Sequence, residues 1–525
     1  MECSCVRHTD VPGASRLFVD LIYHFDRVQD LYTCPPNDVP ALAKASRFDF
    51  PDDRRAALIQ ALTPLNQGNP SLALLAKPGA VAIVTGQQTG LFSGPAYSVY
   101  KALTAIKLAR ELSAAGIPAV PVFWAATEDH DFAEVDHAWV FGADCQPVKI
   151  QARGTAETGS KPVGWIAPGE LPLGELRSAL ADQPFAADAI AMVERAWKPG
   201  ETMGSAFTGF LQEVFRSYGL LVVDPLEPLL RKIAAPLLSE AVERMPELVE
   251  ALIARSKELV ERGYHAQVLV EKTTSLMFLL EGGERIGLRR SNGGFSSVSR
   301  KFTVAELAAR GPELSPNALL LPVIQDYLLP TAAYIGGPAE LAYLAQSQVL
   351  YRKLLGRQPA AFPRAFFTLV DRRSQKRMLR YGLGPTDLFG GEEVLRDRIA
   401  ARLVPEKIRT RLDETTAAVS NALNGLKADL DGFDPSLAEA LATSRRKIEY
   451  QAGKIARKTA RQILIRDEQA VRDAHALSGL VFPGKHLQER IYSIVPFLAA
   501  FGPGLVDDLY AAVRLECPDH QFVVV

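Results

Sequence analysis

A strand, a glycine-bearing loop, a helix and a second strand follow one another between residues 81 and 140, and this order constrains the fold most. The apolar run VAIV begins at Val81 and stops at Thr85 and Gly86, which is typical of a buried parallel strand. After the loop, a helix closes at Gly116 and the run IPAVPVFWAA provides the next strand. This order predicts an α/β fold with a parallel sheet and a crossover helix.

The loop between the first strand and the helix carries the first set of predicted ligand-binding residues. Pro95 is expected in the first turn of the helix and Ser93 as its N-cap. A helix N-terminus above the carboxyl end of a strand is where phosphates and carboxylates bind in such sheets. We therefore predict that backbone N–H groups here bind an anion. The residues assigned to this role are Gly86, Gln87, Gln88, Thr89, Gly90, Ser93 and Gly94.

The second strand leads into a cluster of ionisable residues at the same edge of the sheet. The cluster comprises Glu128, Asp129, His130 and Asp131, followed by Glu134, Asp136 and His137. Such residues suit general acid/base chemistry, recognition of an amine, or metal binding. The alternative is a solvated, acidic start to the next helix. The position opposite a glycine-bearing loop favours function, so the four consecutive residues 128–131 are the predicted catalytic group, and no metal is assigned.

A second strand-to-helix turn lies between residues 317 and 353. A strand-like apolar run leads into Gln325, Asp326 and Tyr327, and a further strand, TAAYI, meets Gly336-Gly337-Pro338 before a new helix. This arrangement repeats the first turn, so the two turns are expected to face one crevice, each binding part of a ligand. The substrate- or phosphate-binding residues predicted here are Gln325, Asp326, Tyr327, Gly336 and Gly337.

Composition limits the classes of protein and partner. The chain of 525 residues has 59 basic and 60 acidic residues, so we expect neither nucleic acid nor an anionic membrane as a partner. Its five cysteines show no disulfide framework, which favours a reducing compartment. No apolar run reaches about 18 residues, and no signal sequence is recognised at the start. A cytoplasmic location is therefore expected.

The pattern changes from about residue 391, where mostly apolar residues recur at spacings of three, four and seven. They are Leu412, Thr415, Val419, Ala422 and Leu426, then Leu441, Ile448 and Ile455. This predicts an antiparallel coiled-coil hairpin that covers its apolar stripe by homodimerisation. We therefore expect three domains. They are a Rossmann-like catalytic core at 1–390 with insertions at about 141–218 and 263–310 (the latter a hairpin), the dimerisation domain at 391–480, and a segment at 481–525 that packs back on the core.

Four long segments resemble those of one family. TGQQTGLFSGP, FWAATEDHDFAEV, PVIQDYLLPTAAYIGGPAELAY and FPGKHLQERIY are similar to the cysteine ligases of bacillithiol biosynthesis, the BshC family. The resemblance implies a core like that of class I aminoacyl-tRNA synthetases and nucleotidyltransferases, a coiled coil and a homodimer. It also implies that cysteine and glucosaminyl-malate are the substrates, joined by an amide in the last step of the pathway.

One departure from the class I synthetases concerns the energy source. Their HxGH-type histidines are absent here, since the corresponding stretch reads Phe92-Ser93-Gly94-Pro95. ATP or ADP is nonetheless the expected nucleotide, because amide formation needs an activated carboxylate. Two other function classes stay open. One is a nucleotidyltransferase that activates a small acid, and the other is a non-catalytic scaffold whose core senses nucleotide.

Overall fold

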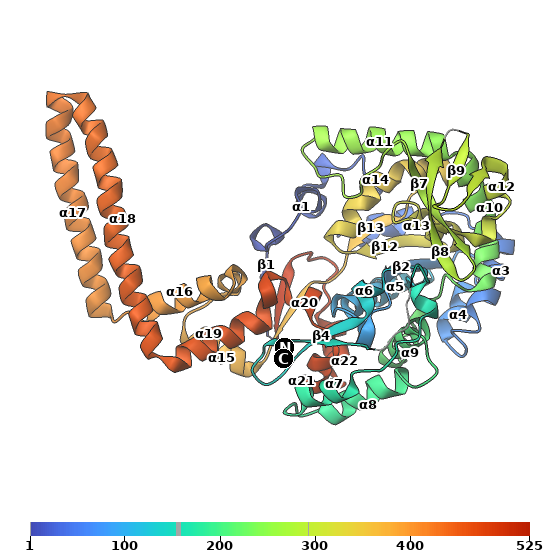
Figure 1. Ribbon diagram of the computed structural model, residues 1–525, viewed down its shortest axis with the longest axis horizontal. Helices are drawn as coiled ribbons and strands as arrows, with labels where there is room; N and C mark the ends of the chain where they lie inside the picture. The colour runs from blue at the N-terminus through green and yellow to red at the C-terminus, as the bar shows by residue number, and fades with distance from the viewer. Residues whose placement is uncertain (1, 154–158, 292) are drawn as a thin grey trace. The chain divides into compact units, whose positions relative to one another are not determined.

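The computed structural model describes residues 2–153, 159–291 and 293–525, which fall into two compact units (Figure 1). The first comprises the chain up to Ala143, Pro147–Thr368 and Glu489–Val523. The second comprises Asp144–Gln146, Leu369–Gln488 and the last two residues. Residues 369–390 therefore belong with the helical unit, while most of the C-terminal segment belongs with the first.

A five-stranded sheet forms the centre of the first unit, in the order β13-β12-β2-β3-β6. Its strands are β2 (Val81–Gln87), β3 (Ala119–Ala125), β6 (Leu221–Val223), β12 (Thr331–Gly336) and β13 (Ala360–Pro363). All four pairings are parallel, and the register of β2 and β3 runs from Val81 opposite Ala119 to Gln87 opposite Ala125. The predicted parallel sheet is confirmed, and its strands are almost entirely buried.

The order of the strands creates a switch point beside β2. The chain passes from β2 to β3 and then β6 on one side, and later returns to place β12 on the other side of β2. Ligands of open α/β sheets bind where the order reverses, outside the carboxyl ends of the strands. The ends of β2 and β12 therefore mark the place to search for a site.

Helices α5 (Tyr97–Ala114) and α14 (Pro338–Leu354) follow β2 and β12. The predicted N-cap at Ser93 is wrong: Ala96 precedes α5, while Ser93 belongs to a 3-10 turn and has φ 81°. The prediction of a strand before Gln325 is also wrong, because these residues belong to helix α13 (Leu321–Leu328). A short apolar run fits a buried helix as well as a strand, and the Asn317 side chain accepts hydrogen bonds from backbone N–H groups just before this helix.

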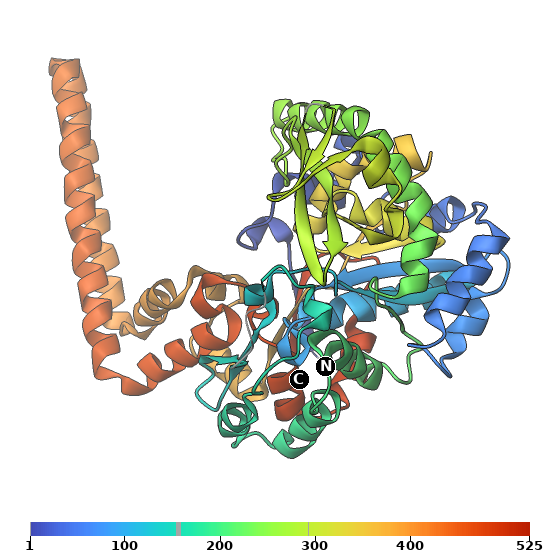
Figure 2. The same ribbon diagram turned by 45° about the vertical axis from the view of Figure 1, so that its right-hand side comes forward.

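A second sheet, with strand order β10-β9-β8-β7-β11, is inserted between β6 and β12. Its strands are β7 (Thr274–Glu281), β8 (Glu284–Ser291), β9 (Gly294–Ser296), β10 (Lys301–Thr303) and β11 (Leu314–Pro316). The predicted hairpin is confirmed, because Glu281 pairs with Glu284 across Gly282 and Gly283, both at positive φ. The run QVLVE at 267–271 is not a strand. Strand β7 packs against helix α11 (Met245–Glu261), which lies beside it in Figure 2.

Further elements complete the first unit. The helices are α1 (Arg16–Tyr23), α2 (Val39–Ala45), α3 (Asp52–Leu62), α4 (Pro70–Leu75), α6 (Phe132–Val135), α7 (Leu173–Leu180), α8 (Ala186–Ala196), α9 (Met203–Val214), α10 (Pro228–Glu243), α12 (Val304–Ala308), α21 (Val495–Phe501) and α22 (Leu505–Ala512). The short strands β4 (His137–Phe141) and β5 (Pro147–Gln151) pair antiparallel. Strands β1 (Glu2–Val6), β15 (His520–Val524) and β14 (Phe367–Val370) form a three-stranded sheet.

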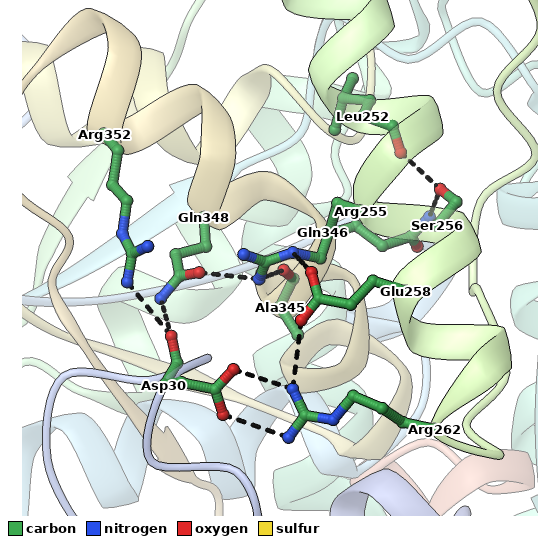
Figure 3. A network of polar contacts seen from close by, with 10 residues as sticks. All are labelled: Asp30, Leu252, Arg255, Ser256, Glu258, Arg262, Ala345, Gln346, Gln348 and Arg352. Carbon is green, nitrogen blue, oxygen red and sulfur yellow. Dashed lines mark hydrogen bonds and ion pairs between the residues drawn. The ribbon is translucent and has the colours of Figure 1, made fainter.

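A polar network fastens α11 and α14 to the N-terminal region (Figure 3). Arg262 binds the Asp30 carboxylate at 2.8 Å, and buried Arg255 donates to the Gln348 side chain at 2.7 Å. The Gln348 amide in turn donates to the Asp30 carbonyl at 2.7 Å. These hydrogen bonds tie α14 to the N-terminal region, while Arg255 Nε makes an ion pair with Glu258 at 3.0 Å but no hydrogen bond.

The second unit contains the predicted helical hairpin, formed by α17 (Glu406–Phe433) and α18 (Pro435–Arg466), which run side by side (Figure 1). Its other helices are α15 (Arg372–Arg380), α16 (Glu392–Leu403) and α19 (Glu468–Val481). The hairpin is confirmed, and its apolar stripe is incompletely covered: Leu426, Ile448 and Ile455 are 45%, 40% and 56% exposed. No helix among the described residues is long and apolar enough to span a membrane.

A buried ion pair at the end of β13 yields a stability prediction. Arg364 binds both carboxylate oxygens of Glu489, at 2.8 and 2.5 Å, and the two residues are 3% and 0% exposed. We expect Glu489→Gln to destabilise the first unit by about 3–5 kcal/mol, because it leaves a buried guanidinium uncompensated. Thermal unfolding measures the loss.

The matched control is the double variant Arg364→Met/Glu489→Leu, which removes both charges. It is expected to unfold at a higher temperature than Glu489→Gln. An unchanged melting temperature for Glu489→Gln contradicts the assigned role of the pair.

Candidate active site

Three adjoining pockets lie at the carboxyl ends of the central strands. The first, of about 350 Å³, lies at the switch point between β2 and β12 and is lined by residues of both strands. The second, of about 610 Å³, shares Trp124, Ala126 and Asp129 with the first. The third, of about 430 Å³, shares Gln87, Gln88, Tyr97 and Arg490 with the first. Because the pockets share walls, we treat them as chambers of one cleft.

A buried lysine on α5 holds the wall of the first pocket together. The Lys101 side chain is only 2% exposed, and its ammonium group lies 2.9 Å from the Gly86 carbonyl, 2.9 Å from Gln87 Oε1 and 2.6 Å from Glu340 Oε2. Burial lowers the pKa of Lys101, and the Glu340 carboxylate acts in the opposite direction. All three N–H donors of the ammonium therefore have partners within the protein.

Glu340 also caps the helix that follows β12. Its Oε2 accepts a hydrogen bond from the Gly337 N–H at 2.8 Å, and its Oε1 accepts one from the Tyr334 hydroxyl at 3.1 Å. A carboxylate at this position satisfies a helix N-terminus in the way a bound anion would. Gly337 does line the first pocket, but its N–H is already used.

The rest of the first pocket combines cationic groups with an unused acceptor. Arg364 and Arg490 both line it. Gln325 lines it too and is 3% exposed, and its Oε1 has no hydrogen-bond partner in the described part of the chain. Buried polar atoms are normally paired, so this oxygen is available to a donor on a ligand.

The second pocket is acidic and is centred on Asp129. One carboxylate oxygen of Asp129 accepts from the Gln88 side chain at 2.8 Å, and the other accepts from the His130 N–H at 2.8 Å. The same Gln88 amide donates to Glu134 at 2.6 Å. The loop after β2 and the cluster after β3 are thus brought together, as the sequence predicted.

His130 contacts an arginine from the inserted sheet. Arg285 Nη1 lies 3.2 Å from His130 Nδ1 and 3.6 Å from Asp129 Oδ1. Since a guanidinium only donates, Nδ1 accepts this hydrogen bond and we assign the ring proton to Nε2. In this arrangement His130 presents an N–H donor, rather than a base, at Nε2.

The remaining predicted catalytic residues differ in exposure. Glu128 is buried, is paired with Arg231 and accepts from the Ser315 hydroxyl at 2.9 Å. Burial raises the pKa of Glu128, and the neighbouring arginines oppose this effect. Asp131 is exposed and precedes the short helix α6. All four predicted residues line the second pocket, and only Asp129 also lines the first.

Several predicted binding residues lie away from these three pockets. Thr89 and Ser93 are buried within the loop. Asp326 is paired with Arg357, and burial raises its pKa to about 7. The Tyr327 ring lies 3.6 Å from the Arg54 guanidinium. None of the four lines the first, second or third pocket.

The backbone donors of the glycine loop are partly occupied. The N–H groups of Gly90, Gly94 and Ala96 donate to carbonyls of Gln88, Leu91 and Tyr492, at 2.9, 3.0 and 2.7 Å. Gly94 has φ +61°, and a Cβ added at Gly90 would lie 2.8 Å from the Gly94 Cα, so both glycines serve the tight path of this loop. Anion binding by the loop stays a prediction. Among the described residues, no group of three or more His, Cys, Asp or Glu is placed to hold a metal.

Sequence reasoning missed four basic residues of the cleft, namely Lys101, Arg285, Arg364 and Arg490. Of these four, Lys101 is the one that the sequence could have indicated. It lies in a helix among mainly small and apolar residues, and a lysine in such surroundings is expected to be buried and paired. Arg285 carries no signal, since only the folded insertion brings it to the cluster.

Comparison with known proteins is consistent with this architecture. The N-terminal Rossmann-like domain of bacillithiol biosynthesis BshC matches residues 1–365, and the C-terminal coiled-coil domain of BshC matches residues 367–525. A protein named "Putative cysteine ligase BshC" from Solibacter usitatus is 51% identical, with 100% of both chains covered. Proteins of the same name from Koribacter versatilis and Salinibacter ruber are 36% and 30% identical, with at least 96% of each chain covered.

The contacts of Lys101 predict how the cleft depends on it. Lys101→Met is expected to lower the melting temperature, because it leaves the Gly86 carbonyl without this donor and the partly exposed Glu340 carboxylate without its cation, a loss of about 1–3 kcal/mol. Lys107→Met on the same helix is the matched control, since Lys107 is partly exposed and contacts only the Tyr510 ring among the cation–aromatic pairs of the described residues. Equal melting temperatures for the two variants would show that Lys101 does not hold this wall.

Proposed function

The chain belongs to the BshC family of bacillithiol biosynthesis, and we propose that it joins the carboxylate of cysteine to the amine of glucosaminyl-malate. The product is an amide, and the reaction is the last step of that pathway. The observation that carries the proposal is the division of the cleft into a chamber with two arginines and a chamber with a carboxylate cluster, which meet at Asp129. The proposed substrates carry the opposite charges: carboxylates on the malate moiety and an ammonium group on cysteine.

The arginine chamber suits the malate moiety, which has two carboxylates. Arg364 and Arg490 line this chamber, and guanidinium groups bind carboxylates through charge-assisted, often bidentate hydrogen bonds. Both terminal nitrogens of Arg364 already donate to Glu489, which fixes its orientation and leaves only its remaining N–H groups for a ligand. Such preorganisation reduces the entropy lost on binding.

The acidic chamber suits the ammonium group of cysteine. Asp129 and Glu134 converge on the Gln88 amide, and carboxylates in a partly desolvated pocket bind an ammonium group strongly. His130 adds an N–H donor at Nε2, which is suited to an oxygen of the cysteine carboxyl group as charge develops there.

Amide formation also requires activation of the carboxyl group, and we propose ATP or ADP as the nucleotide involved. Among the predicted loop donors, the N–H groups of Gly90 and Gly94 are used within the protein, and the neighbouring Lys101 ammonium is also fully paired. Phosphate binding by the other N–H groups of the loop stays a prediction. We assign no residue to the nucleotide.

Reconstitution tests the proposal directly. The purified protein is incubated with cysteine, glucosaminyl-malate and ATP, and the thiol product is followed by mass. We expect the amide to form only when both substrates are present. A nucleotidyltransferase would instead release an activated acid without glucosaminyl-malate, and a scaffold would form no product.

Changes in the acidic chamber should remove activity without unfolding the protein. Asp129→Asn and His130→Ala are each expected to reduce thiol production about 30- to 1000-fold, which corresponds to about 2–4 kcal/mol for a lost contact to a charged group. Bacillithiol in cells and the melting temperature are the two measurements. Asp182→Asn, at an exposed position, is the control, and normal thiol levels in both site variants would place the active site elsewhere.

We also propose that the protein is a homodimer joined through the coiled-coil hairpin. The exposed side chains of Ile448 and Ile455 lie on its predicted stripe, and apolar faces of this kind are usually covered by a partner. Ile448→Glu/Ile455→Glu is expected to give monomers in light scattering at micromolar concentration, with unchanged helix content. A monomeric wild type would refute the dimer.

A further inference from the structure

A histidine–aspartate pair faces the third pocket, outside the residues assigned so far. His137, at the start of β4, lines this pocket together with Tyr97, Glu134 and Arg490. Its Nδ1 lies 2.8 Å from Oδ1 of the adjacent Asp136. The histidine side chain is 23% exposed and the aspartate side chain 13%, so both are largely buried.

The aspartate of this pair is held rigidly by the β4-β5 hairpin. Its second oxygen accepts from the Gln151 side chain at 2.6 Å, and its carbonyl accepts from the Ala152 N–H at 2.9 Å. Gln151 stands directly opposite His137 in the register of the two strands. Because both carboxylate oxygens are occupied, Asp136 has one orientation in which to hold the imidazole ring.

The partner of each histidine decides what the ring can do. An ionised carboxylate only accepts, so Nδ1 of His137 carries the proton and Nε2 of the neutral ring keeps its lone pair. His130 has the opposite arrangement, because Arg285 donates to its Nδ1. Of the two, His137 is therefore the base and His130 the donor.

The third pocket adjoins both substrate chambers. It shares Gln87, Gln88, Tyr97 and Arg490 with the arginine chamber, and Glu134 with the acidic chamber. The loop residues Gln87 and Gln88 thus form a wall common to the arginine chamber and to the pocket that His137 lines. The other predicted bases are less suitable, since Glu128 is paired with Arg231 and Asp131 is exposed.

We propose that His137, oriented by Asp136, accepts the proton that the glucosaminyl amine loses when the amide bond forms. This inference rests on the proposed function. The amine nitrogen attacks the carbonyl carbon of cysteine activated as an acyl phosphate or acyl adenylate, so that the C–N bond forms. The bond from carbon to the phosphate oxygen breaks, the phosphate group leaves with the electron pair, and the amine proton passes to Nε2 of His137.

A comparison of variants in cells provides the first test. Wild-type, His137→Gln, Asp136→Asn and His475→Gln proteins are each produced in a bacterium whose own gene of this family has been deleted, and bacillithiol is measured by mass. His475 is the matched control, because it also pairs with a carboxylate, Glu392, at 3.1 Å, but belongs to the second unit. Loss of a general base typically slows a reaction about 10²- to 10⁴-fold.

We expect His137→Gln to slow thiol formation by at least about 100-fold and Asp136→Asn to slow it by a similar factor. His475→Gln should form the thiol at the wild-type rate. Melting temperatures should stay within a few degrees. If the wild type restores thiol and His137→Gln restores it equally, the inference is wrong while the proposed function stands. If the wild type restores none, the proposed function fails and the inference fails with it.

Hydroxylamine separates proton transfer from every earlier step. It is largely unprotonated near neutral pH and needs no base, so it captures activated cysteine as the hydroxamate. With purified protein, cysteine and ATP, hydroxamate formation by His137→Gln should match that of the wild type while amide formation falls. An equal fall in both products would show that His137 supports activation or structure instead, and would overturn the proposal.

Discussion

The cleft depends on one buried charge, the Lys101 ammonium. It joins the end of β2, through Gly86 and Gln87, to Glu340 at the start of α14, so that the two strand-to-helix turns on either side of the switch point are held together. Burying an ammonium is costly unless it is paired and its donors are satisfied, and both conditions are met here by groups within the protein. The same contacts remove Lys101 and Gly337 from the donors available to a ligand, which leaves anion recognition to arginines.

The parallel sheet, the inserted hairpin and the helical hairpin could be predicted from the sequence because each has a periodicity or turn that admits one interpretation. Apolar runs that end in glycine turns mark β2 and β12, an apolar run that leads into the acidic cluster marks β3, and the Gly282-Gly283 turn marks the inserted strands. The errors occurred where the local pattern was ambiguous. The mostly apolar segment 321–328 is short enough to be read as a strand, but it forms a helix. The loop around Ser93 has positive φ values at two non-glycine residues, and residue propensities do not predict such a conformation.

The candidate site could be predicted only in part. The glycine loop and the cluster at residues 128–131 were expected to meet, and the Gln88 contact with Asp129 shows that they do. The basic residues could not be found in this way, because Arg285 and Arg364 come from segments far along the chain. The distinct roles of His130 and His137 were equally hidden, since they follow from whether a donor or an acceptor faces Nδ1, which only the folded structure reveals.

The central claim is that ligation takes place in the cleft at the carboxyl ends of β2, β3 and β12. A crystal structure of the protein with bound glucosaminyl-malate is the most direct measurement. The account predicts malate carboxylates within hydrogen-bond distance of Arg364 or Arg490, and the glucosaminyl amine on the side of the loop lined by Gln88 and His137. Substrate bound to another part of the first unit or to the helical hairpin, with the cleft empty, would contradict it.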